Sequence, residues 1–514
     1  MDKLPDPRWQ SALAHSRYLA NLLATQPALI PELAAVWMAP LTAEQLAAGL
    51  TPAATDDDAI KAQLRRLRQL TMAHIALRDL CGLAPLAEVV ESMTLLADAT
   101  TNFALDHYHR LLAATYGEPL DKAGRPQRLL IIGMGKLGGR ELNVSSDVDY
   151  IFVYPEEGDT AGPKSIENYD FFTRLGKRVI SALGEITADG QVFRVDMRLR
   201  PNGDSGPLVC SLDALENYFI TQGREWERYA WIKGRTMNAG SNLQPEWVTA
   251  MQKVARPFVF RKYLDFGAIN AMRDLHAQIR REVVRKDMAD HVKLGPGGIR
   301  EIEFIAQVFQ LIRGGRDPGL QIRPTLSVLQ QLVSRQLMPA ETESELREAY
   351  IFLRRLEHRL QYVEDKQTHM LPDNAADRAS VARSMEFADW ASMLAVLNSH
   401  REKVSRHFEQ IFSDPEAGEH PLTGLWMGQL DEDAAIESFG NRGFRQPAEA
   451  IRRLAELRAS SRYLQLPATN RSRLDAIGPR LIEAAGATGD PDTTLARGLH
   501  FIEGISRRGA YLAL

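Results

Sequence analysis

Two aspartates, spaced two residues apart, follow a cluster of glycines. The stretch runs from Arg128 to Pro155 and reads RLLIIGMGKLGGRELNVSSDVDYIFVYP. If the chain is extended at Asp147 and Asp149, both carboxylates point to the same side. Two adjacent carboxylates repel each other, and one stays protonated unless a cation lies between them. The pair therefore predicts a site for a divalent metal ion.

The glycines before the two acids suit a phosphate group. The apolar run from Leu129 to Ile132 is typical of a strand that is buried on both faces. A glycine turn after such a strand lets a phosphate approach backbone N–H groups. A phosphate-binding turn followed by paired acids predicts a metal ion that holds a nucleotide. The glycines of the turn are Gly133, Gly135, Gly138 and Gly139.

The segment GMGKLG also matches the G-x-G-x-x-G pattern of dinucleotide-binding folds. That pattern requires a crossover helix, a second parallel strand and an acidic residue about 20 positions on. Only eight residues separate Gly138 from Asp147, and the residue 20 positions after Gly133 is Val153. Because so short a connection cannot cross a sheet, the dinucleotide interpretation is rejected. A glycine turn with two solvated aspartates is the remaining structural alternative.

A third acid lies in the segment from Val192 to Arg200, VFRVDMRLR, which the alternation of residue types predicts to be a strand. In such a strand Asp196, Arg198 and Arg200 share one face. Asp196 would supply the third carboxylate of a two-metal site for phosphoryl transfer. The two arginines could hold phosphate oxygens as bidentate donors. A structural ion pair between Asp196 and an arginine explains the same residues equally well.

Two further segments supply basic candidates. GREWERYAWIKGR indicates a helix in which Arg228 and Lys233 are candidate contacts to a substrate phosphate. A solvated helix with an aromatic packing face is the alternative. KLGPGGIREIEF is a second glycine turn followed by a buried helix. The charged side chains in the first turn of this helix either interact favourably with the helix dipole or face the nucleotide site. The charged residues of that turn are Arg300, Glu301 and Glu303.

Length and composition describe an ordinary globular protein. The chain has 514 residues, of which 45% are hydrophobic and 25% charged, and this length predicts three or four domains. The net charge of -4 gives no support to a general nucleic-acid binder. Cys81 and Cys210 are too few for a disulfide scaffold and fit a reducing cytoplasm. Since no signal peptide or long apolar run is found, we expect a cytoplasmic protein without a membrane partner.

Helical spacing dominates outside the region of the acids. We expect an N-terminal helical region at 1–115, a catalytic domain at 116–255, a helical bundle at 256–412 and a C-terminal helical segment at 422–514. Within the catalytic domain the expected order is strand, turn, strand, a helix over about 165–186, and strand. The chain ends in the apolar run GAYLAL. Because helices rarely stop inside an apolar run, this end predicts a larger protein.

Four motifs together resemble one family. They are GMGKLGGRELNVSSDVDYIFVYP, FRVDMRLRPNGDSGPLV, QGREWERYAWIKGR and KLGPGGIREIEFIAQVFQLIRGGR. In this order, and over nearly the whole chain, they are similar to the N-terminal half of bifunctional glutamine synthetase adenylyltransferase/adenylyl-removing enzymes. The resemblance implies a mainly α fold with an embedded α/β unit, a DNA polymerase β-like nucleotidyltransferase domain flanked by helical bundles. SSDVD and GREWERYA resemble the adenylyl-removing half, and no second glycine turn with SDxD follows.

The resemblance also implies a reaction and its residues. AMP would leave a tyrosine of glutamine synthetase by phosphorolysis, which gives ADP and active synthetase and requires Mg²⁺ or Mn²⁺. The uridylylated PII signalling protein and 2-oxoglutarate would favour this activity. By the family motif, the metal-binding catalytic acids are Asp147, Asp149 and Asp196. With the basic residues above, the candidate nucleotide- and phosphate-binding set is Gly133, Gly135, Lys136, Gly138, Gly139, Ser145, Ser146, Arg198, Arg200, Arg228, Lys233 and Arg300.

Two other functions remain open at this point. A forward transferase would move AMP from ATP to the tyrosine and release pyrophosphate instead of ADP. A catalytically silent lobe would only bind PII or the synthetase. Three carboxylates in one place argue against the silent lobe, because a binding module does not need them together.

Overall fold

The computed structural model describes residues 4–51, 56–239, 243–261, 288–412, 420–466 and 468–505. The chain forms two compact units. Unit 1 comprises Met1–Asp265 and Ala271–Phe408, and unit 2 comprises Phe266–Asn270 and Glu409–Leu514. The division of unit 1 into three domains stays a prediction. Residues 262–287 of the predicted bundle and the apolar end GAYLAL lie outside the described residues.

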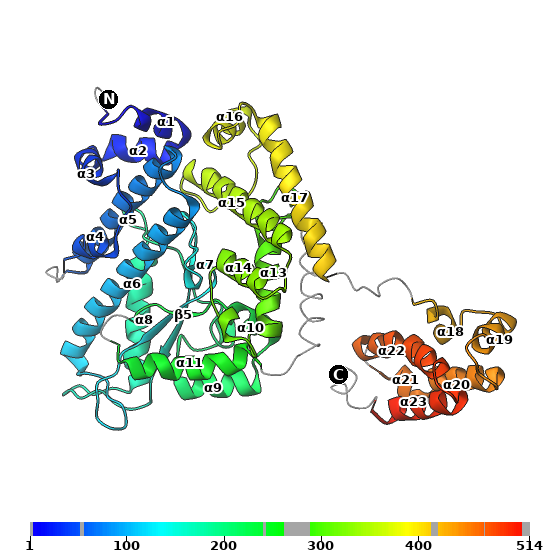
Figure 1. Cartoon of the computed structure of the whole chain (residues 1–514). Helices are drawn as coiled ribbons and strands as arrows, with labels where there is room; N and C mark the ends of the chain where they lie inside the picture. Colours follow the sequence, from blue (N-terminus) through cyan, green and yellow to red (C-terminus); the bar gives the residue numbers. More distant parts are fainter. Residues whose placement is uncertain are drawn as a thin grey trace. The chain divides into compact units, whose positions relative to one another are not determined.

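Unit 1 begins with helices, as the spacing predicts (Figure 1). The two longest of these, α5 and α6, carry apolar side chains into one core that also includes the sheet. Asp56 caps α5 by accepting a hydrogen bond from the backbone N–H of Ala59, and α6 ends at Gly117, where φ is +87°. The helices are α1 (Arg8–His15), α2 (Arg17–Thr25), α3 (Leu29–Val36), α4 (Ala43–Ala48), α5 (Asp57–Leu80) and α6 (Leu86–Tyr116).

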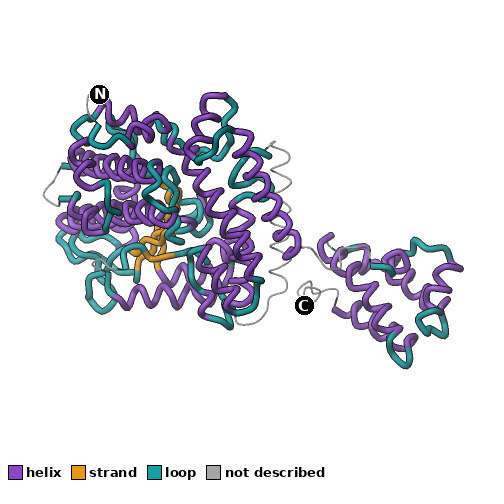
Figure 2. Tube along the Cα trace, turned by 45° about the horizontal axis from the view of Figure 1, so that its top comes forward, coloured by secondary structure: helices purple, strands orange, loops and turns teal. Residues whose placement is uncertain are grey.

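A small mixed sheet lies among the helices of unit 1 (Figure 2). Its strands are β1 (Leu130–Gly133), β2 (Val148–Tyr154), β3 (Val195–Asp196), β4 (Val209–Ser211) and β5 (Arg235–Thr236). β1 runs antiparallel to β2 and to β5, whereas β3 and β4 run parallel to β2. Every residue of β1 is buried, as the apolar run predicts.

The predicted third strand is much shorter than expected. The alternation over 192–200 predicts one continuous strand, but β3 holds only Val195 and Asp196. The chain turns directly afterwards, because the Asp196 carboxylate accepts the backbone N–H of Arg198 at 2.8 Å. The prediction that Asp196, Arg198 and Arg200 share one strand face is therefore wrong.

The remaining elements around the sheet are helices. The expected helix over 165–186 is present as α8 (Asn168–Gly184), which packs against α6. The segment GREWERYAWIKGR is helical only over α10 (Glu225–Trp231), and its Arg235 lies in β5. The other elements here are the short 3₁₀ turn η1 (Gly203–Ser205), α9 (Leu212–Thr221) and α11 (Pro245–Val259).

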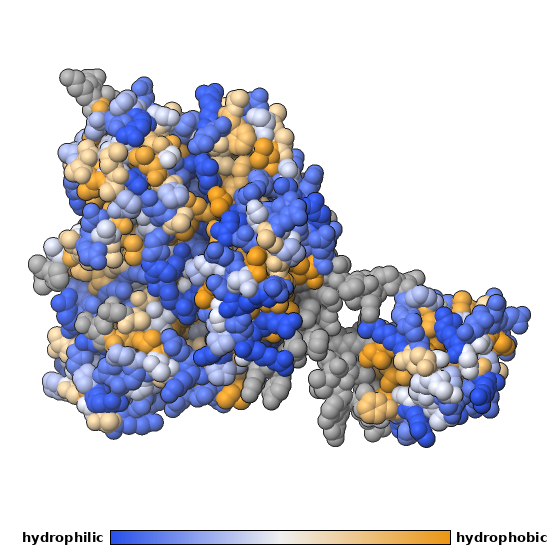
Figure 3. All heavy atoms as spheres, viewed as in Figure 1, coloured by the Kyte–Doolittle hydropathy of each residue, from blue (hydrophilic) through white to orange (hydrophobic). Residues whose placement is uncertain are grey.

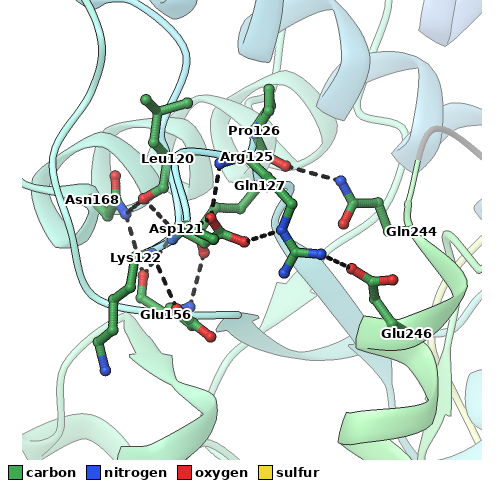
Figure 4. Close-up of polar contacts among 11 residues, drawn as sticks. Leu120, Asp121, Lys122, Arg125, Pro126, Gln127, Glu156, Asn168, Gln244 and Glu246 are labelled. Carbon is green, nitrogen blue, oxygen red and sulfur yellow. Dashed lines mark hydrogen bonds and ion pairs between the residues drawn. The ribbon is translucent and has the colours of Figure 1, made fainter.

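The loop that joins α6 to β1 is held by polar contacts (Figure 4). The side-chain amide of Gln127 donates to the carbonyl oxygens of Leu120 and Glu156, at 2.7 Å and 3.0 Å. Asn168, the first residue of α8, donates to the same two oxygens at 2.8 Å and 3.2 Å. Because these oxygens have two donors each, the loop fixes the start of α8 against the end of β2.

The C-terminal part of unit 1 is again helical. It begins with the predicted second glycine turn, after which Ile302 and Ile305 are fully buried in a helix. The elements are α13 (Ile299–Arg313), η2 (Pro318–Leu320), α14 (Thr325–Ser334), α15 (Ala340–Tyr362), α16 (Ala375–Ser384) and α17 (Trp390–Phe412). The predicted fold class, mainly α with an embedded α/β unit, is confirmed, and the polymerase β type stays a prediction.

Unit 2 has a hydrophobic core of its own, built around Trp426. Its helices are α18 (Thr423–Met427), α19 (Glu432–Gly440), α20 (Pro447–Ala459), α21 (Ser461–Leu464), α22 (Ala468–Gly486) and α23 (Pro491–Ile505). Hydrophilic residues cover most of the face in Figure 3, with apolar residues scattered among them. Among the described helices, none combines the length and the apolar character needed to cross a membrane.

Replacement of Gly138 by alanine is expected to destabilise unit 1. An added Cβ would lie 1.9 Å from the carbonyl oxygen of Lys233 and 2.3 Å from that of Gly133. Neither oxygen can move without shifting β1 or the chain before β5, so we expect a loss of about 2 kcal/mol in the free energy of unfolding. Urea denaturation followed by tryptophan fluorescence measures this loss.

The matched control is Gly184→Ala, in the last turn of α8. There the added Cβ would meet its nearest atom at 3.6 Å, which is ordinary contact. We expect its free energy of unfolding to change by less than about 1 kcal/mol. Equal denaturation midpoints for the two variants would contradict the packing of Gly138.

Candidate functional site

The sheet brings the three acids together. β2 and β3 are adjacent and parallel, and their register pairs Asp149 directly with Asp196. Asp147 lies immediately before β2, where the backbone N–H of Val148 donates to the carbonyl oxygen of Arg194 at 2.9 Å. Residues that are 47 positions apart in the sequence thus meet at one end of two strands.

The acids differ in their electrostatic surroundings. Burial, together with the negative charges of Asp196 and Asp147, raises the pKa of Asp149 to about 6. Asp196 accepts hydrogen bonds from the Arg198 side chain, and these lower its pKa. Asp147 forms an ion pair with Arg194. Two of the three carboxylates are therefore compensated by a neighbouring arginine, whereas Asp149 is partly buried among like charges.

The chemistry of these donors fits a hard divalent cation. Carboxylate oxygens are the ligands that Mg²⁺ and Mn²⁺ prefer in proteins. Across the described ranges, no three acidic, histidine or cysteine side chains stand close enough to hold a metal ion in their present orientations. Asp147 and Asp196 turn toward Arg194 and Arg198 instead. Asp147, Asp149 and Asp196 are the residues that would hold such an ion.

The glycine turn borders Asp149. The turn forms the single helical turn α7 (Gly135–Gly138), and the backbone N–H of Met134 donates to the carbonyl oxygen of Asp149 at 3.0 Å. Gly135 has a φ of +53°, and a Cβ on it would lie 3.4 Å from the Asp149 carboxylate. Gly135 thus keeps the space beside the carboxylate open, whereas Gly138 allows the turn to pack against Lys233.

Lys136 and the two serines surround the same segment. The ammonium of Lys136 lies 3.6 Å from Glu357, and burial lowers the pKa of Lys136 to about 8. The backbone N–H of Ser145 donates to the Gln361 side chain at 3.0 Å, while its buried hydroxyl has no hydrogen-bond partner among the described residues. The hydroxyl of Ser146 donates to the carbonyl oxygen of Asp147 at 3.0 Å.

The basic candidates fall into two groups. Arg198 lies beside Asp196 with 72% of its side chain exposed, and Arg200 donates to the carbonyl oxygen of Met197 at 2.9 Å. Arg300 lies in the first turn of α13. Two others are buried in other contacts. Arg228 pairs with Glu225 and donates to the carbonyl oxygen of Val259, and Lys233 pairs with Glu141.

Several charged residues near the acids have no part in the sequence prediction. Lys293 lies close enough to Asp149 to oppose the rise in its pKa, and Arg194 pairs with Asp147. Lys293 opens the second glycine motif and Arg194 lies in VFRVDMRLR, so both motifs contain a signal for them. Glu357 of α15 reaches Lys136 from more than 200 positions away, and nothing in its local sequence indicates this contact.

The sequence of the chain matches two family models. The first, glutamate-ammonia ligase adenylyltransferase, matches residues 8–249. The second, GlnD PII-uridylyltransferase, matches residues 273–412. The first match covers the strands and acids described above, and the second covers the described helices α13 to α17.

The names of curated relatives agree with the first family model and with the family that the four motifs resemble. The bifunctional glutamine synthetase adenylyltransferase/adenylyl-removing enzyme of Aromatoleum aromaticum is 56% identical over 515 residues, which cover 100% of this chain and 54% of the relative. The enzymes of the same name from Chromobacterium violaceum and Nitrosomonas europaea are 50% and 48% identical, over 97% and 98% of this chain and 55% of each relative.

The chain thus spans about half the length of the curated relatives it matches. The first three motifs lie within the first family model, and the identities extend over the whole chain, including the fourth motif. The chain belongs to the glutamate-ammonia ligase adenylyltransferase family, a family of nucleotidyltransferases.

Proposed function

We propose that unit 1 removes AMP from adenylylated glutamine synthetase by phosphorolysis, giving ADP and the unmodified synthetase. The observation that carries this proposal is the register of β2 and β3, which pairs Asp149 with Asp196 beside Asp147 and the glycine turn. The SSDVD and GREWERYA motifs favour removal over transfer, because they resemble the adenylyl-removing half of the family. The forward reaction, AMP transfer from ATP, is the alternative.

The residues suit the chemistry of phosphorolysis. A phosphate anion attacks the α-phosphorus of AMP, and the tyrosine leaves as a phenolate. Since a phenol has a pKa of about 10, the leaving group needs no strong general acid. The main barrier is electrostatic, because an anion attacks an anion. Arg198, together with Arg200, would hold the attacking phosphate, and Gly135 leaves room for a phosphate beside Asp149.

Asp147, Asp149 and Asp196 would hold Mg²⁺ or Mn²⁺ during the reaction. When bound, the metal would neutralise charge on the phosphate oxygens. The protein's own part is to keep three carboxylates at one strand end and to keep Asp149 partly buried. Lys293 would add a positive charge near Asp149.

The proposed partners follow from the names of the relatives and from the second family model. Glutamine synthetase is the proposed protein substrate, because the relatives' names include it. The match to a PII-uridylyltransferase model over residues 273–412 supports uridylylated PII as a regulator. We propose 2-oxoglutarate as an effector and the cytoplasm as the location, on the family resemblance alone.

Incubation of the chain with adenylylated glutamine synthetase, Mg²⁺ and radiolabelled phosphate is expected to give labelled ADP. The Asp147→Asn, Asp149→Asn double variant is expected to lose at least about a thousandfold in rate, because the phosphate charge is then not neutralised. Excess EDTA is expected to stop the unmutated chain, and added Mn²⁺ to restore it. Thin-layer separation of ADP from AMP and pyrophosphate measures the product.

The matched control is Asp189→Asn, which removes an exposed aspartate from the turn between α8 and β3. It is expected to form ADP at the rate of the unmutated chain. Release of AMP that has not taken up labelled phosphate would contradict phosphorolysis. Formation of ATP that depends on pyrophosphate would contradict it as well. Unfolding of the double variant would assign the acids a structural role; we expect its thermal midpoint to be no lower than the parent's, because like charges are removed.

Substitution of Arg198 by glutamine is expected to change the KM for phosphate, whereas substitution of Arg228 by glutamine is expected to change the stability of the fold. Arg198 is mostly exposed, so Arg198→Gln should raise the KM for phosphate about tenfold and change the free energy of unfolding by less than about 1 kcal/mol. Arg228 is fully buried, so Arg228→Gln should lower the free energy of unfolding by about 2–3 kcal/mol.

Steady-state kinetics at varied phosphate and urea denaturation measure the two quantities. A KM change in Arg228→Gln with an unchanged free energy of unfolding would show that this buried arginine serves the substrate. An unchanged KM in Arg198→Gln would remove Arg198 from the phosphate site.

A further inference from the structure

A cavity of about 950 Å³ lies in unit 1, and the three aspartates are not among the residues that line it. Its walls are the connection from α5 to α6, the residues after the glycine turn, and one face each of α14 and α15. Sites for small molecules usually measure about 300–1,000 Å³. The cavity is therefore large enough for an organic molecule of that class.

Most of the cavity wall is apolar. The side chains come from elements that are far apart in the sequence but pack in the same unit. A pocket of this kind holds the body of a ligand by burying apolar surface. The apolar residues of the wall include Leu83, Pro85, Leu86, Val90, Leu326 and Ile351.

Three guanidinium groups lie in this wall, and each has a carboxylate partner. Arg140 pairs with Glu91, Arg347 with Glu343 and Arg355 with Glu386. Arg140, Arg347 and Arg355 have side chains that are 37%, 35% and 33% exposed. Arg347, Ile351 and Arg355 follow each other at intervals of four residues, so they lie on one face of α15. The pair between Arg355 and Glu386 is 3.4 Å long, and the Glu386 side chain is 73% exposed. An incoming anion can therefore replace Glu386 at small cost.

The carboxylates deep in the wall are already occupied. Asp79 pairs with Arg359 at 2.7 Å and accepts the hydroxyl of Tyr362 at 2.9 Å. Glu141 pairs with Lys233 at 2.6 Å. Both acids are buried, with exposures of 4% and 6%. Glu91, which also lines the cavity, pairs with Arg140. The charged residues of α15 that line the cavity are all arginines, which favours an anionic group on that side.

We propose that this cavity is a ligand site, distinct from the three aspartates, for an organic anion with an apolar body. Ile351 and its apolar neighbours cover the body of the ligand. Arg347 and Arg355 hold its acidic group, which is a carboxylate, sulfonate or phosphate. Neither the three aspartates nor the glycines of the turn line this cavity, although Glu141 and Arg354 of its wall also contact each other in holding the segment that joins them.

The probe for the test is 1-anilinonaphthalene-8-sulfonate, which joins an aromatic body to a sulfonate. The full chain is titrated with it, and fluorescence and equilibrium dialysis give affinity and stoichiometry. We expect one saturable site. Ile351→Trp, which places a larger side chain against the site for the body of the ligand, should weaken binding at least tenfold. The Arg347→Gln, Arg355→Gln double variant keeps the cavity and should weaken binding about fivefold to tenfold.

The uncharged analogue N-phenyl-1-naphthylamine separates charge from shape. The unmutated chain should bind the sulfonate more tightly than the analogue, and the double arginine variant should lose that preference. Arg406→Gln, an exposed arginine that pairs with Glu345, is the matched control and should bind like the parent. Thermal unfolding confirms that each variant is folded.

Unchanged affinity in both the Ile351→Trp and the double arginine variant would overturn the proposal, because the probe would then occupy another place. If Ile351→Trp fails to fold, the double arginine variant decides alone, since its side chains are partly exposed and their loss leaves the core intact. A preference for the uncharged analogue in the unmutated chain would also overturn it. No catalytic assay is involved, so either result leaves the proposed phosphorolysis to its own test.

Discussion

Repulsion between carboxylates at one end of β2 and β3 is the constraint on which the rest of unit 1 depends. The register of the strands fixes the backbone of Asp149 opposite that of Asp196, so the two residues stay neighbours whatever their side chains do. The chain compensates by placing Arg194, Arg198 and Lys293 around the acids. Asp149 nevertheless stays among like charges, and this is the electrostatic reason for the proposal that the acids hold a divalent cation.

A second set of charges lies buried behind the glycine turn. Glu357 is fully buried and contacts Arg354 at 3.2 Å, His369 at 2.8 Å and Lys136 at 3.6 Å. Burial alone would raise the pKa of Glu357. These partners nevertheless hold that pKa well below its usual range. Loss of one partner would leave the buried charge of Glu357 less well compensated, which is costly. The set therefore fixes the turn with the geometry that the acids require.

The local motifs of the sequence predict much of the site. The apolar run and the glycines predict β1 and its turn, and the spacing of Asp147 and Asp149 predicts acids at a strand end. Alternation fails at Arg198, because the Asp196 side chain caps a turn that a pattern of residue types does not reveal. Burial of Arg228 and Lys233 depends on α11 and Glu141, and a helix pattern alone does not show which basic residues have such partners.

The segment between the glycine turn and the acids takes its partners from a distant helix. Arg354 donates to the carbonyl oxygen of Glu141 and to the Asn143 side chain, and Gln361 accepts the N–H of Ser145. These partners follow 211 to 216 positions later in the chain. At about 5–20 residues per second, a ribosome needs roughly 10–40 s to add that length. During synthesis, the segment between the glycine turn and the acids therefore lacks these partners until α15 has been made.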